Sequence, residues 1–396
     1  MMKKNIVFVI PSLSAGGAEK SLVNLLNTID YKEYNVDLVL FKKAGVFLSL
    51  IPKEVVLVDL NANYKIFAKG LLSSCFTFLI QLRFGLLYNR IMFFLTNKRI
   101  KNVAVAEQKA WQYLSDAIAV LPNKYDAAIG FLEKSSIYFT VDKIQAKHKI
   151  GWIHTTYSKS GMDSNFDENY FNSLQAVIAV SPECVDDLKK SFPKLQSKFK
   201  LIYNIVSSQL IHKLASEDFD HTEVSTNSIV TIARLSPEKG CDIALDASCL
   251  LRDMGIDFTW MVIGDGPERA SLEKKIKEQK MERYFQLLGV KKNPYPYLSA
   301  AKMYVQPSRY EGKSMAIEEA KILRKPIVIT NFSSAKDQIT HLETGIISKT
   351  DAASLAEEIK KILSDYAIQE KLVLNLSSQN FGTESEVQQL YRLINE

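Results

Sequence analysis

Two cations near the middle of the chain have the types and spacing of a phosphate-binding loop. Arg234 and Lys239 lie five residues apart in the segment 234–240, directly after an apolar run that predicts a strand. Guanidinium and ammonium groups bind phosphate oxygens through charge-assisted hydrogen bonds. The segment therefore indicates a diphosphate site, and an ordinary solvated loop is the alternative.

Two carboxylates follow further along the chain, at Glu311 and Glu319. Glu311 precedes a predicted helix over 315–323, and Glu319 falls inside it. Carboxylates in these places can contact hydroxyl groups on separate parts of one ligand, while the amides around Ser314 and Met315 face a phosphate. The alternative is a surface helix with acidic residues near its start, which the helix dipole favours in any case.

Glycines and one histidine in the first half occupy positions where strands are expected to end. Gly16 and Gly17 follow the predicted first strand, where glycine lets the backbone approach a ligand and the next helix offers N–H groups to an anion. A tight strand-to-helix turn is the alternative there. His154 ends the predicted strand 149–154, and a lone histidine in that place is more often structural. The turn at 264–267 is interpreted as structural.

The elements that must position these residues follow from an alternation of short apolar runs and helical periods. Continuous hydrophobic runs suit parallel strands covered on both faces, and helices between them give βαβ units. We predict strands at 6–10, 36–41, 55–60, 127–131, 149–154, 176–180, 228–233, 259–264, 285–289, 303–307, 326–330 and 345–347, and helices at 18–27, 243–254, 271–280, 315–323 and 355–364.

The same rhythm restarts after a polar, acidic segment at 216–227, which is the expected linker. We expect an N-terminal domain over 1–215 and a C-terminal domain over 228–380, with a last helix over 381–396 that packs back on the N-terminal domain. The predicted fold class is α/β, with two doubly wound Rossmann-like domains facing a central cleft. Ligands of such sheets bind at the carboxyl ends of the strands.

In this order the motifs resemble those of the retaining GT-B glycosyltransferases, specifically glycosyltransferase family 4 (group 1). That family has a Gly-Gly loop after its first strand, an Arg…Lys-Gly loop that opens the C-terminal domain, a Gly-x-Gly-Pro turn and a Glu-x7-Glu signature near the nucleotide. The resemblance covers the C-terminal half well and the N-terminal half only at its first loop and at His154. The matching residues are Gly16-Gly17, Arg234…Lys239-Gly240, Gly264–Pro267 and Glu311…Glu319.

The resemblance implies roles for the donor-binding residues. Arg234 and Lys239 would hold the diphosphate of a sugar nucleotide and stabilise charge on the leaving phosphate. Gly16 and Gly17 belong to the same set, with Gly17 approaching the diphosphate from the opposite domain. The family needs neither a metal nor a cofactor, and no Asp-x-Asp motif lies at a predicted strand end.

The resemblance also implies contacts to the sugar and the ribose. Glu311 would contact the donor sugar, Glu319 would bind the ribose hydroxyls, and His154 would lie near the reacting sugar. The donor-binding set includes Ser314 and Met315. The family commonly has an aromatic or aliphatic residue and then Gly or Pro after Glu-Gly, whereas this chain has Lys313-Ser314-Met315. The identity of the donor therefore stays open.

The implied function is transfer of a hexose-type sugar, with retention of anomeric configuration, from a donor that we expect to be UDP-linked. A lipid-linked saccharide is the expected acceptor, as in the synthesis of capsule, exopolysaccharide or glycolipid. One alternative is a GT-B-shaped partner subunit that stabilises another glycosyltransferase. Another is a sugar-nucleotide 2-epimerase of similar fold. A nicotinamide enzyme is disfavoured because no Gly-x-Gly-x-x-Gly follows any predicted strand.

The stretch from 60 to 106 departs from the rest of the chain because it contains no Asp or Glu and seven basic residues among many Phe and Leu. Arg83 and Arg90 are seven residues apart and share one helical face. A basic amphipathic helix of this kind is typical of segments that lie in a membrane surface. The alternative is a helix pair packed on the first sheet with its arginines extended toward solvent.

Composition bounds the remaining classes. The 396 residues suit two domains, and a net charge of +6 is too weak to indicate a nucleic-acid partner. The four cysteines form no Cys-x-x-Cys pair and indicate buried thiols in a reducing compartment. The apolar run near the N-terminus stops at Pro11, too early for a signal peptide, and no window is long enough to span a membrane. We therefore expect a cytoplasmic protein, peripheral at the inner face of the cell membrane.

Overall fold

The chain divides into two compact units in a computed structural model that describes residues 3–14, 16–220, 224–225 and 227–396. The first unit runs to Ile205 and includes the C-terminal segment Ser385–Glu396. The second unit is Val206–Glu384. Part of the expected linker, residues 221–223 and 226, lies outside the described residues.

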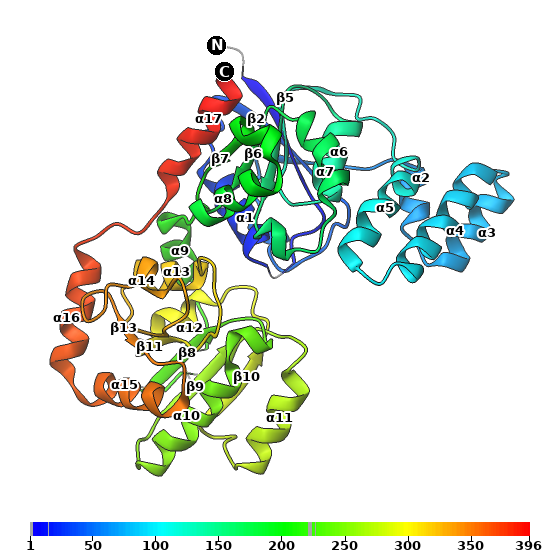
Figure 1. Cartoon of the computed structure of the whole chain (residues 1–396). Helices are drawn as coiled ribbons and strands as arrows, with labels where there is room; N and C mark the ends of the chain where they lie inside the picture. The colour runs from blue at the N-terminus through cyan, green and yellow to red at the C-terminus, as the bar shows by residue number, and fades with distance from the viewer. Residues whose placement is uncertain (1–2, 15, 221–223, 226) are drawn as a thin grey trace. The chain divides into compact units, whose positions relative to one another are not determined.

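The first unit is built on a seven-stranded, all-parallel sheet in the order β3-β2-β1-β4-β5-β6-β7 (Figure 1). The interior strand β1 carries five consecutive fully buried apolar residues, as a parallel strand covered on both faces requires. The strand β7 was not predicted, because Lys200 interrupts its apolar residues. The strands are β1 (Lys4–Ile10), β2 (Tyr34–Leu40), β3 (Val55–Val58), β4 (Lys124–Gly130), β5 (Gln145–Ile153), β6 (Ala176–Ala179) and β7 (Phe199–Leu201).

Helices connect these strands, and α17 at the C-terminus returns to the same unit. The ring of Tyr391 in α17 stacks on Tyr34 with centroids 4.6 Å apart, and its hydroxyl accepts the Asp30 N–H at 2.8 Å. The helices are α1 (Gly17–Thr28), α2 (Ala62–Phe67), α3 (Leu71–Ile80), α4 (Phe84–Arg99), α5 (Val103–Ser115), α6 (Ser135–Lys143), α7 (Ser164–Asn172), α8 (Pro182–Ser191) and α17 (Val387–Asn395).

The second unit is built on a six-stranded parallel sheet in the order β10-β9-β8-β11-β12-β13. Alternate residues of β8 and β9 enter two separate apolar clusters, because successive side chains of a strand point to opposite faces. Both faces of this sheet are therefore covered. The strands are β8 (Ser228–Ile232), β9 (Thr259–Ile263), β10 (Phe285–Gly289), β11 (Met303–Gln306), β12 (Ile327–Thr330) and β13 (Ile346–Ser348).

The helices of the second unit include the four predicted between residues 243 and 364, each within a few residues of its predicted bounds. They are α9 (Ser208–Ala215), α10 (Cys241–Asp253), α11 (Arg269–Glu278), α12 (Tyr295–Ala300), α13 (Met315–Ile322), α14 (Ala335–Gln338), α15 (Ala352–Ser364) and α16 (Tyr366–Ser377). The two doubly wound α/β sheets confirm the predicted fold class.

The boundary between the units differs from the one predicted. The prediction gave 1–215 to the N-terminal domain, but α9 belongs to the second unit, where it contacts α12 and α13. Its buried residues Ile211 and Leu214 supply the apolar side of the helix. The C-terminal return begins at Ser385 instead of 381, because Thr383 and Glu384 hydrogen-bond to residues 206 and 208 of the second unit.

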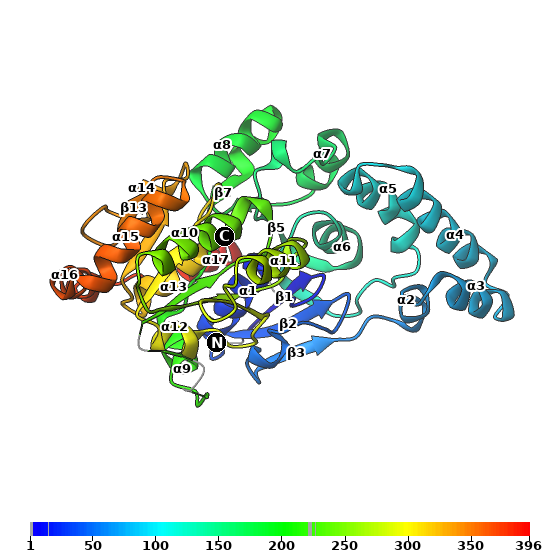
Figure 2. The same cartoon turned by 90° about the horizontal axis from the view of Figure 1, so that it is seen from below.

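The acid-free stretch 60–106 forms the helices α2, α3 and α4 and the start of α5, where a helix pair was one expectation. Both views show α3 and α4 extending to one side of the sheet of the first unit (Figures 1 and 2). A small apolar cluster holds the extension together around Phe67 and Phe78, with Leu86, Leu87 and Phe93 packed against it. Among the described residues, no helix has the length and apolar character needed to cross a bilayer.

Candidate functional site

Glu311 is the centre of a buried polar network in the second unit. Its side chain is 6% exposed and lies in the loop after β11. Glu311 Oε2 pairs with Lys239 Nζ at 2.7 Å. Its Oε1 accepts hydrogen bonds from Gln306 Nε2 at 3.0 Å and from Ser308 Oγ at 2.7 Å. The structure thus brings together two of the predicted site residues, Lys239 and Glu311. Three contacts fix the orientation of the Glu311 side chain.

The loops that carry Lys239 and Glu311 are joined by their backbones. The Arg309 N–H donates to the Glu238 carbonyl at 2.8 Å, and the Arg309 guanidinium binds both Asp242 oxygens at 2.7 and 2.6 Å. Gly240 has φ +65°, and a Cβ there would lie 2.0 Å from the Pro307 carbonyl oxygen. Only glycine permits this approach, so the glycine that follows Lys239 sets the distance between the two loops.

Arg234 lies in the loop after β8, and the turn at 264–267 supports that loop. Gly264 has φ +148°, and a Cβ there would lie 1.9 Å from the Ala233 carbonyl oxygen. The Leu235 N–H donates to the Asp265 carbonyl at 3.1 Å. These contacts are consistent with a structural role for the turn, which supports the segment that carries Arg234.

Two cations and a carboxylate lie close together in this segment. The Arg234 side chain is exposed. A hydrogen bond from Ser236, together with the charges of Lys239 and Arg234, lowers the pKa of Glu238. Because Lys239 pairs with Glu311, Arg234 is the more accessible of the two cations.

Glu319 lies in α13 and has no exposed surface. The hydroxyl of Tyr295, in α12, donates to Glu319 Oε1 at 3.2 Å. Burial is the main cause that raises the pKa of Tyr295, and the negative charge of Glu319 adds to it. A ligand hydroxyl can reach this carboxylate only after a covering group has moved.

The start of α13 is already partly occupied. The Ser314 N–H donates to Gln338 Oε1 at 2.8 Å, so that amide is not open to a phosphate in this structure. Met315 is the first residue of the helix and carries one of the N–H groups that have no partner within a helix. Of the two amides predicted to face a phosphate, Ser314 would have to exchange a protein acceptor for a ligand.

The predicted residues of the first unit lie at two strand ends. Gly16 precedes the first turn of α1, and a Cβ at this glycine would lie 2.1 Å from Glu19 Oε2. Gly17 is the first residue of α1. Ala15, between β1 and these glycines, lies outside the described residues.

His154 follows β5 directly, with its ring 5.0 Å from that of Phe131. Both ring nitrogens are shielded from solvent and neither makes a well-formed hydrogen bond to the described residues. Burial lowers the pKa of His154 to about 3, and the weaker influences of the Asn204 side chain and the Phe131 backbone oppose it only in part. The imidazole is therefore neutral at physiological pH.

Several residues of the network were not predicted. Gln306 and Ser308 stand five and three residues before Glu311, at the end of a predicted strand. Their position at the carboxyl end of that strand was the feature that could have predicted them. Tyr295 and Asp242 come from separate segments, so no spacing in the sequence connects them to Glu319 or Arg309. Among the described residues, no three His, Cys, Asp or Glu side chains lie close enough to hold a metal.

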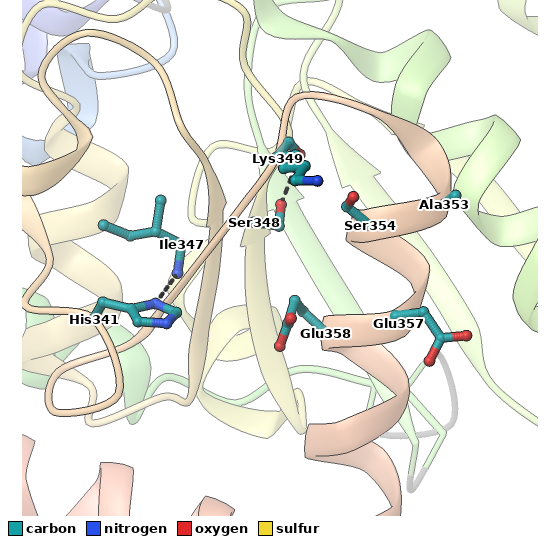
Figure 3. A pocket seen from close by; sticks show the side chains of 8 residues that line it. All are labelled: His341, Ile347, Ser348, Lys349, Ala353, Ser354, Glu357 and Glu358. Carbon is teal, nitrogen blue, oxygen red and sulfur yellow. Dashed lines mark hydrogen bonds between the residues drawn. The ribbon is translucent and has the colours of Figure 1, made fainter.

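A cavity of about 480 Å³ lies elsewhere in the second unit, between β13 and α15 (Figure 3). Its lining includes His341, Lys349, Glu357 and Glu358. His341 Nδ1 accepts the Ile347 N–H at 3.0 Å, which ties that side chain to the strand. None of the predicted donor-binding residues lines this cavity, so it is not the site described above.

Residues 216–378 match the family model described as glycosyl transferases group 1. A 2-deoxystreptamine N-acetyl-D-glucosaminyltransferase of Niallia circulans is 30% identical over 151 residues. That alignment covers 37% of this chain and 39% of the relative, so the chain matches about two fifths of the relative's length.

Two further similarities extend over almost the whole chain. A Campylobacter jejuni enzyme is 25% identical over 382 residues, which is 95% of this chain and 92% of that protein. It is named as a GalNAc-α-(1→4)-GalNAc-α-(1→3)-diNAcBac-PP-undecaprenol α-1,4-N-acetyl-D-galactosaminyltransferase. The crystal structure of Anabaena HepE in complex with UDP and glucose superposes with a TM-score of 0.67 at 19% identity, over 99% of this chain and 100% of that one.

Proposed function

We propose, on the premise that residues 216–378 belong to the glycosyl transferases group 1 family and that the chain has a GT-B fold, that this protein is a retaining glycosyltransferase. It moves a hexose-type sugar from a UDP-sugar to a lipid-linked saccharide in the synthesis of cell-surface polysaccharide or glycolipid. The observation that carries the proposal is the contact of Lys239 with Glu311 in two joined loops.

The cations of the second unit would bind the donor diphosphate. The Lys239 ammonium has three N–H donors, so it can bind a phosphate oxygen while keeping its contact with Glu311. Arg234 is exposed in the same loop and can bind a second oxygen. As the bond to the leaving phosphate breaks, negative charge grows there, and preorganised cations stabilise it.

The carboxylates would bind the sugar and the ribose. Glu311 is held by Gln306, Ser308 and Lys239, which leaves it rigid and suited to accept a hydroxyl of the donor sugar. Glu319 would accept the ribose hydroxyls in place of Tyr295, whose hydroxyl now contacts it. Met315 and Ser314 would offer amides to the phosphate, the latter after leaving Gln338.

The first unit would contribute Gly16, Gly17 and His154. Gly17 would allow close approach of the diphosphate, since glycine has no Cβ. A neutral His154 can donate one hydrogen bond and accept another, and it serves the reacting sugar without carrying a proton as imidazolium. Retention would follow a front-face route, in which the acceptor attacks from the side of the leaving phosphate.

Known proteins support the substrate classes. The Anabaena HepE structures hold UDP, UDP and glucose, or UDP-glucose. The Campylobacter jejuni relative acts, by its name, on a saccharide linked through diphosphate to undecaprenol. An amylovoran biosynthesis glycosyltransferase of Erwinia amylovora is a further relative, at 30% identity over 34% of its length. We extend a UDP donor and a lipid-linked acceptor to this chain on that basis.

The helical extension α2–α5 would dock the enzyme on an anionic membrane surface at the cytoplasmic face. Apolar side chains on α3 and α4 are exposed, with Leu72 at 86% and Phe76 at 65%. No acidic residue lies between Asp59 and Glu107. A large exposed apolar surface with basic neighbours suits an interface with anionic lipid. The other exposed apolar side chains there are Leu79, Ile80, Leu82, Phe84, Tyr88, Ile91 and Phe94.

The two arginines predicted to contact lipid have other partners. Arg83 donates to Asn63 Oδ1, and Arg90 donates to the Lys69 carbonyl at 3.1 Å. The Arg90 guanidinium also lies over the rings of Phe67 and Phe93, at 5.3 and 5.8 Å. Arg90 is therefore packed into the extension, whereas Arg83 stays exposed. We assign lipid contact to the exposed basic residues Lys65, Lys69, Arg83, Lys98, Arg99 and Lys101.

A donor panel tests the function. The purified full chain would be incubated with each UDP-, GDP- and dTDP-sugar and a bacterial lipid extract, and nucleotide release would be measured. We expect UDP release from a UDP-sugar that depends on the extract, and the same result for a Lys274→Ala control on exposed α11. Conversion of the sugar nucleotide without release would indicate the epimerase. Activity seen only with a second glycosyltransferase present would indicate the partner subunit.

A further inference from the structure

A buried carboxylate outside the donor site lies at the carboxyl edge of the first sheet. Strands β4 and β5 pair in register, with Gly130 opposite Gly151. Glu133 and His154 each stand three residues beyond this pair, so the register brings them to the same edge. Glu133 is 8% exposed, and it was not among the residues predicted for the donor site.

The contact between the two loops runs through the Glu133 side chain. Its Oε1 accepts the backbone N–H of His154, and the N–H of Thr155 also stabilises its charge. Burial is the largest influence on its pKa and raises it. The neighbouring Lys134 does not pair with Glu133, because its ammonium contacts Glu107 of α5.

The backbone is held in a costly conformation to present this side chain. Lys134 has φ +63° and ψ −120°, a region that a residue with a Cβ seldom adopts. Such conformations persist only where the surroundings enforce them and are concentrated at functional sites. Here Glu107 enforces it, through the Lys134 ammonium and through the Ser135 hydroxyl at 3.1 Å.

The ring of His154 depends on this backbone contact for its orientation. The ring packs between aromatic side chains, with Phe131 at 5.0 Å and Trp152 at 6.1 Å. No strong hydrogen bond to the described residues holds its nitrogens. Its direction is therefore set by ring packing and by the position of its own peptide, which Glu133 holds.

We propose that Glu133 is a positioning residue for His154: its carboxylate fixes the peptide that follows β5 so that the imidazole faces the reacting sugar. The proposal rests on the proposed function, since it assumes that His154 serves sugar transfer. It extends that function to a carboxylate that contacts no ligand and acts through another residue. Glu107 of α5 supports this arrangement through its contact with Lys134, the residue that follows Glu133.

The test compares Glu133→Ala and Glu133→Gln with the wild-type full chain. Glu133→Ala removes the acceptor for the two amides, and a displacement of about 1 Å at the reacting group lowers kcat by about 10²-fold. Glu133→Gln keeps a carbonyl oxygen in the same place, so it should recover most of that loss. UDP affinity, measured by calorimetry, should be unchanged in both, because the donor cations belong to the other unit.

Glu168→Gln is the matched control, since Glu168 is a more exposed carboxylate of the same unit, 3.9 Å from Lys194. It should keep the wild-type kcat. A melting curve accompanies each variant. If Glu133→Ala fails to fold, Glu133→Asp takes its place, because it keeps the charge but withdraws the acceptor oxygens by one methylene, and it should lower kcat at unchanged KM for the donor. Wild-type kcat in folded Glu133→Ala, or in Glu133→Asp where alanine does not fold, would overturn the proposal. Absence of sugar transfer by the wild type would instead overturn the proposed function.

Discussion

Individual residues of the donor site differ in how much the fold depends on them. Lys239 neutralises a Glu311 carboxylate that is otherwise buried, whereas Arg234 is exposed. We expect Arg234→Ala and Lys239→Ala each to lower the transfer rate by about 10²–10³-fold, the typical cost of losing one preorganised donor to a developing charge. Steady-state kinetics with a UDP-sugar would measure this, and wild-type turnover in Arg234→Ala would remove the diphosphate assignment.

Stability separates the two variants at this scale. Lys239→Ala leaves a buried charge without its partner, which destabilises a protein more than the pair stabilises it. Its melting temperature should fall, by about 2–4 °C for each kcal/mol lost in a unit of this size. Adding Glu311→Gln should restore the melting temperature and not the rate. Arg234→Ala should melt as the wild type does.

At the scale of the element, α4 packs on α2 through Arg90, an arginine that was predicted to contact lipid. Arg90 lies over two phenylalanine rings, and burial is the main cause that lowers its pKa. Arg90→Glu replaces these attractions by repulsion and should cost about 1–3 kcal/mol of unfolding free energy. Chemical denaturation of the full chain would detect this as a lower midpoint.

Arg83→Glu provides the comparison for Arg90→Glu on the same helix. Arg83 precedes the first turn of α4, and a carboxylate at a helix N-terminus interacts favourably with the dipole. We therefore expect Arg83→Glu to leave the midpoint nearly unchanged although it loses the contact with Asn63. Equal destabilisation by both variants would contradict the packing role assigned to Arg90.

At the scale of the molecule, the proposed membrane contact rests on the exposed apolar side chains of α3 and α4. The full chain should sediment with phosphatidylglycerol vesicles and not with phosphatidylcholine vesicles, and salt should weaken binding because it screens surface charge over about 10 Å at 0.1 M. The pair Leu72→Ser and Phe76→Ser, two side chains that are 86% and 65% exposed, should reduce sedimentation strongly.

Leu374→Ser is the control for this change, because Leu374 is 69% exposed on α16 of the other unit. It should sediment as the wild type does. The triple variant Lys98→Glu, Arg99→Glu and Lys101→Glu should bind less and lose its salt dependence. Wild-type sedimentation that ignores lipid charge would show that the extension does not recognise an anionic surface.

The sequence alone determined the two α/β sheets and the segments that carry the proposed donor residues. Buried parallel strands need continuous apolar runs, so nearly every strand and the α1, α10 and α13 helices were visible as periodicity. The boundary at Ile205 was not, because α9 is amphipathic and could have packed on either sheet. The helix α9 packs on α12 and α13 because their surfaces are complementary to its own, and these helices are distant from α9 in the chain.

Only the tertiary structure decided which polar groups meet. Gln306, Ser308 and Lys239 contact the Glu311 carboxylate. The hydroxyl of Tyr295 contacts Glu319, and Glu133 accepts the backbone N–H of His154. Most of these contacts join segments that are distant in the chain. Arg90 shows the limit most clearly. Its spacing from Arg83 predicted that the two arginines share one helical face, but Arg83 lies before the first residue of α4, and Arg90 packs over two phenylalanine rings. Local periodicity is encoded by neighbouring residues, whereas the partner of a side chain depends on how the elements pack against each other.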